Sequence, residues 1–371
     1  MSEKLALKRL TASDLTFFEW HFRNRNAGNQ KAINLNADVF AGRLYPAIEV
    51  VARQSRNKIG VDLWIAGPGA AAPHNFQRKI IKGAAYKNWR LDGEVVYNPE
   101  ADPERFNALR PGDLALLGFD GELAPNTMHL VLVSRSAPED GVLFARLDEL
   151  LAERRMAELP GDSLRELCEG LPLPPSHPAW LLLAEEDLAE AALGQAPAIA
   201  RLLTRPRPRR VTLEDLQTAR RNAEDLGRLG ESLVDLHLER RRAASEIDDY
   251  EWTAEINAVS PYDFRLRADK TWEKLEVKTT AGDFSREYHL PLSELREAAH
   301  GPETYRIARV YGATPTSGKM RVSGDLRPFA HSILRALSGL PNGITPNGVT
   351  IVPDSATFGE ETILLGPPDE D

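Results

Sequence analysis

The sequence predicts an α/β protein, with a β-rich N-terminal half followed by a C-terminal core of mixed sheet flanked by helices. At 371 residues the chain is long for one domain. Short β runs separated by Gly and Pro fill its first third, whereas a long amphipathic helix pattern opens the last third. We therefore expect an N-terminal domain over 1–135, a helical connector over 136–211, a core over 212–335 and a C-terminal extension over 336–371.

Composition narrows the class of protein. Hydrophobic residues make up 42% and charged residues 27% of the chain, enough apolar material for a globular core. No stretch approaches the ~18–20 apolar residues of a membrane span, and the first residues lack the apolar run of a secretory signal. Cys168 is the only cysteine, which excludes an internal disulfide and a cysteine-rich zinc site. We expect a cytoplasmic protein with no membrane contact.

The N-terminal half has strong strand signals. The β runs at 115–119 and 129–133 are separated by turn residues, including Asp120-Gly121, which predicts strand, turn and strand. We expect a small barrel or twisted sheet with one or two helices. Near the start, residues 10–22 read as a helix or strand for which Ser13 or Asp14 is available as the cap.

The connector differs in charge from the region before it. Residues 1–110 carry 17 Lys and Arg and 11 Asp and Glu, a net +6, whereas residues 137–200 carry 4 and 13, a net −9. Leu, Ala and Glu favour two or three helices over 141–200, whose apolar faces could form a dimer interface. The Pro- and Arg-rich run 204–210 is either a solvated hinge or a phosphate contact.

The C-terminal core begins with the clearest element of the chain. Leucines recur at three- and four-residue spacing over 212–243, which predicts one long amphipathic helix. Three β runs follow at 252–259, 262–266 and 274–280. A strand turning into a helix at 288–301, a strand at 305–312 and a helix at 327–337 complete an α/β core.

Three residues of this core suggest chemistry. Glu276 and Lys278 lie two apart on one β run, so their side chains share a face, and Asp263 at the start of the preceding run approaches Glu276 if the two strands pair. Adjacent carboxylates repel unless a cation such as Mg²⁺ neutralises them. A lysine beside them would stabilise a phosphoryl transition state, which indicates phosphodiester hydrolysis. The alternative is an exposed Glu/Lys pair on a solvated strand.

Residues 229–311 carry a family resemblance. The features are Gly230-Glu231 with Val234, Tyr262-Asp263, the run Glu276–Thr280, Leu292-Ser293-Glu294, and Tyr305 with Arg309-Val310-Tyr311. This stretch resembles the domain found at the C-terminus of the plant NO VEIN protein and in many bacterial restriction and defence proteins, a branch of the PD-(D/E)XK nucleases. It departs from related sequences in having Ser260-Pro261 where a Gly-rich run often precedes the Tyr-Asp pair.

The resemblance implies a restriction-endonuclease-like core with a bound metal. It implies that Glu231, Asp263 and Glu276 hold Mg²⁺ or Mn²⁺, and that Asp263, Glu276 and Lys278 are catalytic. Glu231 could instead be a surface acid near the basic run 240–242. His237 and His289 have no partner at metal-ligand spacing, and we expect both to be structural.

Two clusters in the N-terminal half combine basic and aromatic residues, the footprint of nucleic-acid binding. The alternative is a solvated amphipathic surface whose aromatic rings belong to the core. The candidate nucleic-acid-binding residues are Arg23, Arg25, Asn29 and Lys31 in the first cluster, and Arg78, Lys79, Lys82, Lys87, Trp89 and Arg90 in the second.

Together these features predict a restriction-type DNA endonuclease whose N-terminal domain reads the target, which could be modified DNA. The alternatives are a non-catalytic DNA-binding or adaptor subunit of a defence complex, and an RNA nuclease. Cutting both strands of a duplex predicts a homodimer. The sequence has no phosphate-binding GxxxxGK[ST] loop, so any ATPase would be a partner subunit of the defence system.

Overall fold

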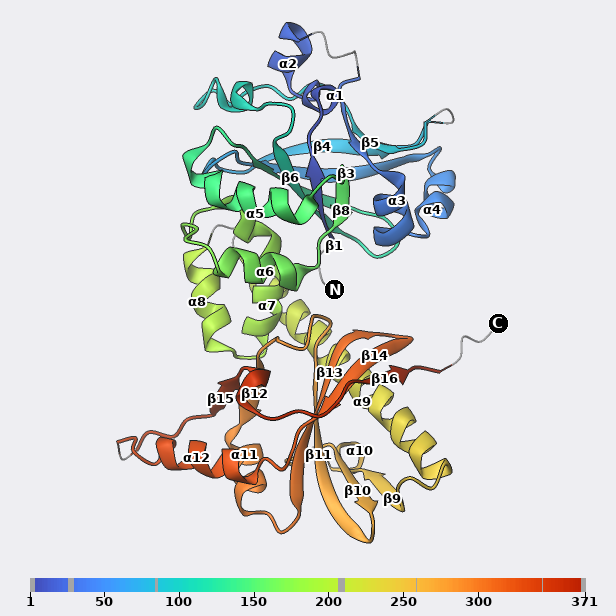
Figure 1. The fold of residues 1–371 in the computed structure, drawn as a ribbon, viewed down its shortest axis with the longest axis vertical. Helices are drawn as coiled ribbons and strands as arrows, with labels where there is room; N and C mark the ends of the chain where they lie inside the picture. Colours follow the sequence, from blue (N-terminus) through green and yellow to red (C-terminus); the bar gives the residue numbers. More distant parts are fainter. Residues whose placement is uncertain are drawn as a thin grey trace. The chain divides into compact units, whose positions relative to one another are not determined.

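The computed structural model describes residues 4–25, 30–83, 86–205, 211–257, 259–341 and 343–367. It divides into two compact units (Figure 1). One holds most of residues 2–211, and the other holds residues 212–371 together with the short segment Ala189–Ala196. The mixture of sheet and helix in both units confirms the expected α/β class.

The N-terminal unit is built on an eight-stranded, barrel-like sheet in the order β2-β5-β4-β3-β7-β6-β1-β8. β6 and β7 form the antiparallel pair that the sequence predicts, with Leu114 opposite Val133. One core lies on the concave side of the sheet. The strands are β1 (Lys4–Arg9), β2 (Ala32–Leu35), β3 (Lys58–Ala66), β4 (His74–Ile81), β5 (Trp89–Asp92), β6 (Leu114–Asp120), β7 (Thr127–Val133) and β8 (Met156–Glu158).

Short helices lie between these strands. The first begins after Thr11, whose hydroxyl accepts from the backbone N–H of Asp14 while Asp14 bonds back to Thr11. Thr11 is therefore the cap, and the expected Ser13 and Asp14 lie inside the first turn. The helices are α1 (Ala12–Leu15), α2 (Glu19–Asn24), α3 (Ala37–Val39), η1 (Phe40–Leu44), α4 (Ile48–Gln54), η2 (Arg105–Ala108) and η3 (Pro138–Asp140).

The region expected as a connector covers the second face of this sheet. Leu143, Leu147 and Leu151 of one helix pack with Leu164 and Leu116 in a second core. The apolar faces that we expected to be free for a dimer interface are therefore largely occupied by the sheet. The helices are α5 (Gly141–Leu151), α6 (Gly161–Glu169), η4 (Pro178–Leu183), α7 (Ala184–Ala192) and α8 (Ala196–Thr204).

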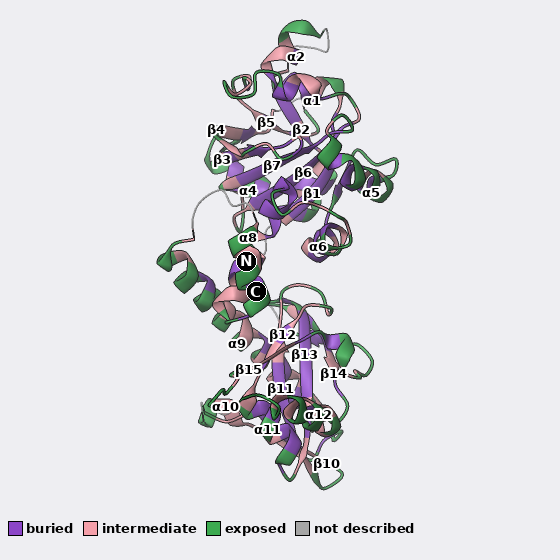
Figure 2. Ribbon diagram, turned by 90° about the vertical axis from the view of Figure 1, so that its left-hand side faces the viewer, coloured by how far each residue is buried: buried purple, intermediate pink, exposed green. Residues whose placement is uncertain are grey.

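The C-terminal unit is a six-stranded mixed sheet in the order β16-β14-β13-β11-β10-β9. α9 (Leu213–Ala243) is the expected long helix, and the C-terminal half of it packs on one face of the sheet. The other face packs against α11 (Leu292–His300), α12 (Arg327–Leu337) and a two-stranded sheet of β12 and β15. Figure 2 shows how β11 and β13 are buried between these layers.

The remaining elements differ from the expected ones at two places. The strand expected over 252–259 is replaced over much of its length by α10 (Thr253–Ile256), and the segment expected as an extension supplies β15 and β16. The strands are β9 (Asp249–Trp252), β10 (Phe264–Ala268), β11 (Thr271–Thr279), β12 (Tyr288–Pro291), β13 (Thr304–Thr314), β14 (Ser317–Val322), β15 (Gly348–Ile351) and β16 (Thr362–Leu365), with η5 at Pro353–Ser355. No helix of the described ranges is both long enough and apolar enough to cross a membrane.

Candidate active site

Side chains of β11 alternate between an apolar face and a polar face. Leu275 and Val277 face α9 and join its core, so Glu276 and Lys278 point to the opposite face, toward α11. β11 pairs in parallel with β13, which places Ile307, a residue of the core on that face, beside Glu276. Both polar side chains are thereby held at largely buried positions in the middle of the sheet.

Asp263 reaches the same place from the neighbouring strand. β10 and β11 pair antiparallel with Phe264 opposite Leu275, as the sequence predicts. The carboxylate oxygen Oδ2 of Asp263 accepts from the backbone N–H of Val277 at 2.7 Å. Burial, with a smaller effect from the charge of Glu276, raises the pKa of Asp263 to about 7. Two carboxylates thus share one poorly solvated space.

Lys278 is held between two acids. Its Nζ lies 2.6 Å from Oε1 of Glu276 and 2.8 Å from Oε2 of Glu294. Burial opposes the charge of the ammonium, but the two carboxylates outweigh it and raise the pKa of Lys278. Burial likewise raises the pKa of Glu276 to about 8, despite the adjacent lysine. The lysine remains charged and cannot neutralise every acid around it.

Glu294 is a site residue that the sequence reasoning did not select. It lies in the first turn of α11, directly before the buried Leu295 and on a helix that also buries Ala298 and Ala299, and its side chain is itself buried. An acid on the apolar side of an amphipathic helix is the signal that could have identified it, because such a group needs a buried partner. Here that partner is Lys278.

Glu231 approaches from the other side of the sheet. It lies on α9, where Nε1 of Trp252 donates to its Oε2 at 3.2 Å. Burial and the charge of Asp263 both raise the pKa of Glu231. Its carboxylate therefore lies within electrostatic range of Asp263. The helix can come this close because Gly230 faces β11 without a side chain.

Two buried side chains fix the backbone around the cluster. Arg309 on β13 donates from Nη1 to the carbonyl of Lys278 at 3.1 Å and from Nη2 to the carbonyl of Arg286 at 2.8 Å. The hydroxyl of Tyr305 donates to the carbonyl of Pro261 at 2.6 Å, two residues before Asp263. Tyr305 and Arg309 therefore support the site by holding the backbone close to Asp263 and at Lys278.

The donor set suits a hard divalent cation. Carboxylate oxygens are the ligands that Mg²⁺ and Mn²⁺ prefer, and Asp263, Glu276 and Glu231 supply several with only one lysine to offset them. Burial is the main cause that raises the pKa of all three carboxyl groups, and a neighbouring carboxylate adds to the shift of each. As they stand, no three acidic, His or Cys side chains of the described ranges are grouped closely enough to hold an ion. Metal loading would require their side chains to rearrange.

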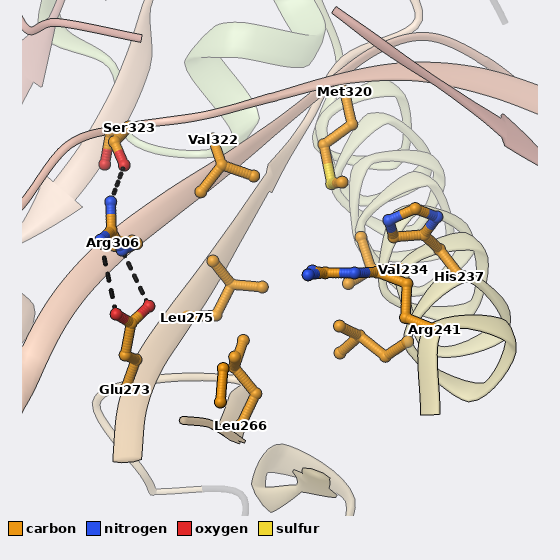
Figure 3. A pocket seen from close by; sticks show the side chains of 12 residues that line it. Val234, His237, Arg241, Leu266, Glu273, Leu275, Arg306, Met320, Val322 and Ser323 are labelled. Atoms are coloured by element: carbon orange, nitrogen blue, oxygen red, sulfur yellow. Dashed lines mark hydrogen bonds and ion pairs between the residues drawn. The ribbon is translucent and has the colours of Figure 1, made fainter. Parts of the chain in front are cut away.

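A separate cavity of about 250 Å³ lies on the opposite face of the same sheet, against α9 (Figure 3). Its floor is apolar and includes Leu275 and Val322. Arg306 closes one side by bonding Glu273 at 2.9 Å and the carbonyl of Ser323 at 3.0 Å. This cavity contains none of the clustered acids.

The first N-terminal basic cluster is partly engaged in local contacts. Arg23 forms an ion pair with Glu19 at 2.5 Å, although its side chain remains exposed. The cation of Arg25 lies over the ring of Trp20, and that of Lys31 over Phe22. Asn29 lies outside the described residues.

The second basic cluster divides between core and surface. Trp89 is 1% exposed and packs in the core, so its ring offers no surface to a base. Arg90 lies 3.6 Å from the ring centroid of Tyr86, and Lys79 pairs with Asp92 at 3.6 Å. Lys82 donates to the backbone carbonyl of Lys87. Arg78 turns to the other face of its strand and lines a cavity.

The acidic cluster lies within a region that matches a known family. Residues 232–322 match the family described as Protein NO VEIN, C-terminal. The NO VEIN C-terminal domain therefore includes Asp263, Glu276, Lys278 and Glu294, whereas Glu231 lies one residue before the match. A search of curated proteins gave no match to the chain.

Proposed function

We propose that the C-terminal unit hydrolyses phosphodiester bonds of DNA with a divalent metal, as a nuclease of the PD-(D/E)XK type. The observation that carries this proposal is the convergence of Asp263, Glu276 and Lys278 from two paired strands on one buried face. Burying acids and a lysine together costs desolvation free energy, and such clusters of ionisable groups are concentrated at functional sites.

The three carboxylates of Glu231, Asp263 and Glu276 would hold Mg²⁺ or Mn²⁺. When bound, the ion would lower the pKa of a water molecule and polarise the phosphoryl oxygen. Val277, through its backbone N–H, holds the Asp263 carboxylate in place. Lys278 keeps a positive charge beside the position where negative charge accumulates as water attacks phosphorus and the P–O bond to the leaving group breaks.

The N-terminal unit would bind and read the DNA. Its first 110 residues carry a net charge of +6, although the whole chain is acidic. Arg23, Arg90 and Lys79 keep partly exposed side chains that suit phosphate contacts. A non-catalytic adaptor is the less favoured function, because such a protein has no need to retain the buried lysine and its acids.

The deciding experiment is incubation of the full chain with supercoiled plasmid, methylated and unmethylated, in Mg²⁺, Mn²⁺ or EDTA. Cleavage that requires metal and is lost in Lys278→Met supports the proposal. A parallel RNA substrate distinguishes a DNase from an RNase. Intact plasmid with both metals, together with retained DNA binding, would favour the adaptor function.

A further inference from the structure

A cavity of about 430 Å³ lies in the N-terminal unit, between the start of β4 and the chain that follows β5. Its volume falls within the range of small-ligand sites. Its lining combines rings with charged groups, and includes His74, Phe76, Arg78, Glu94, Tyr97 and Phe106.

Strand pairing creates this space. β5 pairs with β4 only over Lys79–Ile81, so the first half of β4 has no strand partner on that side among the described residues. His74, Phe76 and Arg78 alternate onto one face there. The returning chain passes close by, since a Cβ on Gly93 would lie 2.6 Å from Cδ of Arg78. This contact fixes one wall of the cavity.

The aromatic residues of the cavity differ in how much of each ring is open to a ligand. Phe106 is 1% exposed and is held by stacking on Phe18 at a centroid distance of 4.5 Å. Phe76 is partly buried against the same core. Tyr97, by contrast, is 58% exposed, so its ring is open to a ligand. The buried Phe106 closes the floor of the cavity, and the ring of Tyr97 offers a stacking surface.

The polar residues offer both hydrogen-bond donors and acceptors. The guanidinium of Arg78 lies over the ring of Phe76, and its buried Nε has no hydrogen-bond partner in the described part of the chain. Glu94 supplies an acceptor at the same cavity.

We propose that this cavity binds a nucleobase turned out of a DNA strand. The inference rests on the proposed function, which makes DNA the substrate. A planar heterocycle would stack on Tyr97 while its edge bonds Arg78 and Glu94. A bare phosphate would meet the repulsion of Glu94, and an aliphatic ligand would leave Arg78 and Glu94 without partners. A nucleobase uses both the aromatic surface and the polar pair of Arg78 and Glu94.

The test uses the full chain carrying Lys278→Met, so that no probe is cut. The probe is a single-stranded DNA of about 8 nucleotides with one central 2-aminopurine, which needs no unpairing and no known target sequence. We expect a several-fold loss of 2-aminopurine fluorescence on binding, because the base stacks on aromatic rings. An abasic site at the centre should weaken binding at least about tenfold.

Variants assign the signal to the cavity. Tyr97→Ala and Arg78→Met should each abolish the fluorescence change, whereas Gln77→Ala, an exposed neighbour on the outer face of β4, should keep it. Equal binding of the abasic probe, or quenching that persists in both cavity variants, would overturn the proposal. If the probe is quenched but wild-type protein does not cleave plasmid in Mg²⁺ or Mn²⁺, the nuclease proposal is refuted and the cavity assignment stands. If wild-type protein cleaves plasmid but the probe is not quenched, the cavity assignment is refuted and the nuclease proposal stands.

Discussion

Gly230 of α9 faces the side chain of Thr279 on β11 so closely that a Cβ would lie 1.8 Å from its hydroxyl oxygen. The helix therefore rests on the strand at the end that carries Lys278. This contact also brings the next residue, Glu231, within electrostatic reach of Asp263. Gly230 and Glu231 thus act together: because Gly230 has no side chain, α9 lies close to β11 and holds the Glu231 carboxylate near Asp263.

Gly230→Ala should push α9 away from β11. Thr279 is on a central strand and cannot move aside, so we expect a loss of stability of about 1–3 kcal/mol from overpacking and a larger loss of cleavage than of DNA binding. Gly227→Ala is the matched control, because its Cβ would meet nothing within 4 Å. Removing a helical glycine there should stabilise the protein by up to about 1 kcal/mol. Equal melting temperatures for both variants would contradict this account.

Lys278→Met should reduce cleavage by about 100-fold or more, since a preorganised charge that stabilises a transition state contributes that much. Lys274→Met is the control on the same strand, where the lysine pairs with Glu297 at 2.5 Å. Both variants lose a largely buried ion pair, so both should melt at lower temperature, but only Lys278→Met should lose activity. The plasmid assay and thermal unfolding together make the distinction, and comparable activity losses would show that the effect is structural.

Glu294→Gln tests the residue that sequence reasoning did not select. The amide can still accept a hydrogen bond from Lys278 but no longer attracts its charge. We expect cleavage to fall by about 10-fold with a shift of its pH profile, as the lysine loses one of its two ion pairs. Glu297→Gln, less than one turn further along the same helix, removes the partner of Lys274 instead and should leave the profile in place. An unaltered profile in Glu294→Gln would make Glu294 a packing residue.

Asp263→Asn should change how stability depends on pH. The folded state holds the carboxyl pKa at about 7, above the ordinary value near 3.9, so the folded protein binds a proton more tightly and loses stability as pH rises from about 4 through 7. Without added metal, the variant should therefore be more stable than wild type by up to about 4 kcal/mol at pH 8 and by little at pH 4. Chemical unfolding at the two pH values measures this, and parallel stability curves would argue against it.

The C-terminal site could be anticipated because its geometry follows from local rules. Strand alternation places Glu276 and Lys278 together, and an antiparallel neighbour brings Asp263 beside them. Glu294 was harder to anticipate, because its position depends on how α11 packs across the sheet. Residues 253–256 read as a strand by composition but form a helical turn, since the chain must pass from β9 into the loop before Asp263.

The N-terminal unit shows where sequence patterns are ambiguous. Trp89 and Arg90 are adjacent in a basic, aromatic run, but strand alternation sends the ring of Trp89 into the core and leaves Arg90 outside. The cavity beside Arg78 depends on the unequal lengths of β4 and β5 and on the path of residues 93–99. Neither feature has a local sequence signal, because both arise from tertiary packing.

Cutting both strands of a duplex requires two active sites or two successive events. The chain has one set of Asp263, Glu276 and Lys278, and one such set hydrolyses one phosphodiester at a time. The strands of a duplex are related by local two-fold axes, so a C₂ dimer places one site on each strand. We therefore expect dimers on DNA and linear plasmid as the early product. Light scattering with and without DNA, beside a plasmid time course, measures both properties. A chain that stays monomeric and accumulates only open circles would instead be a nicking enzyme, because a single site would then act on a single strand.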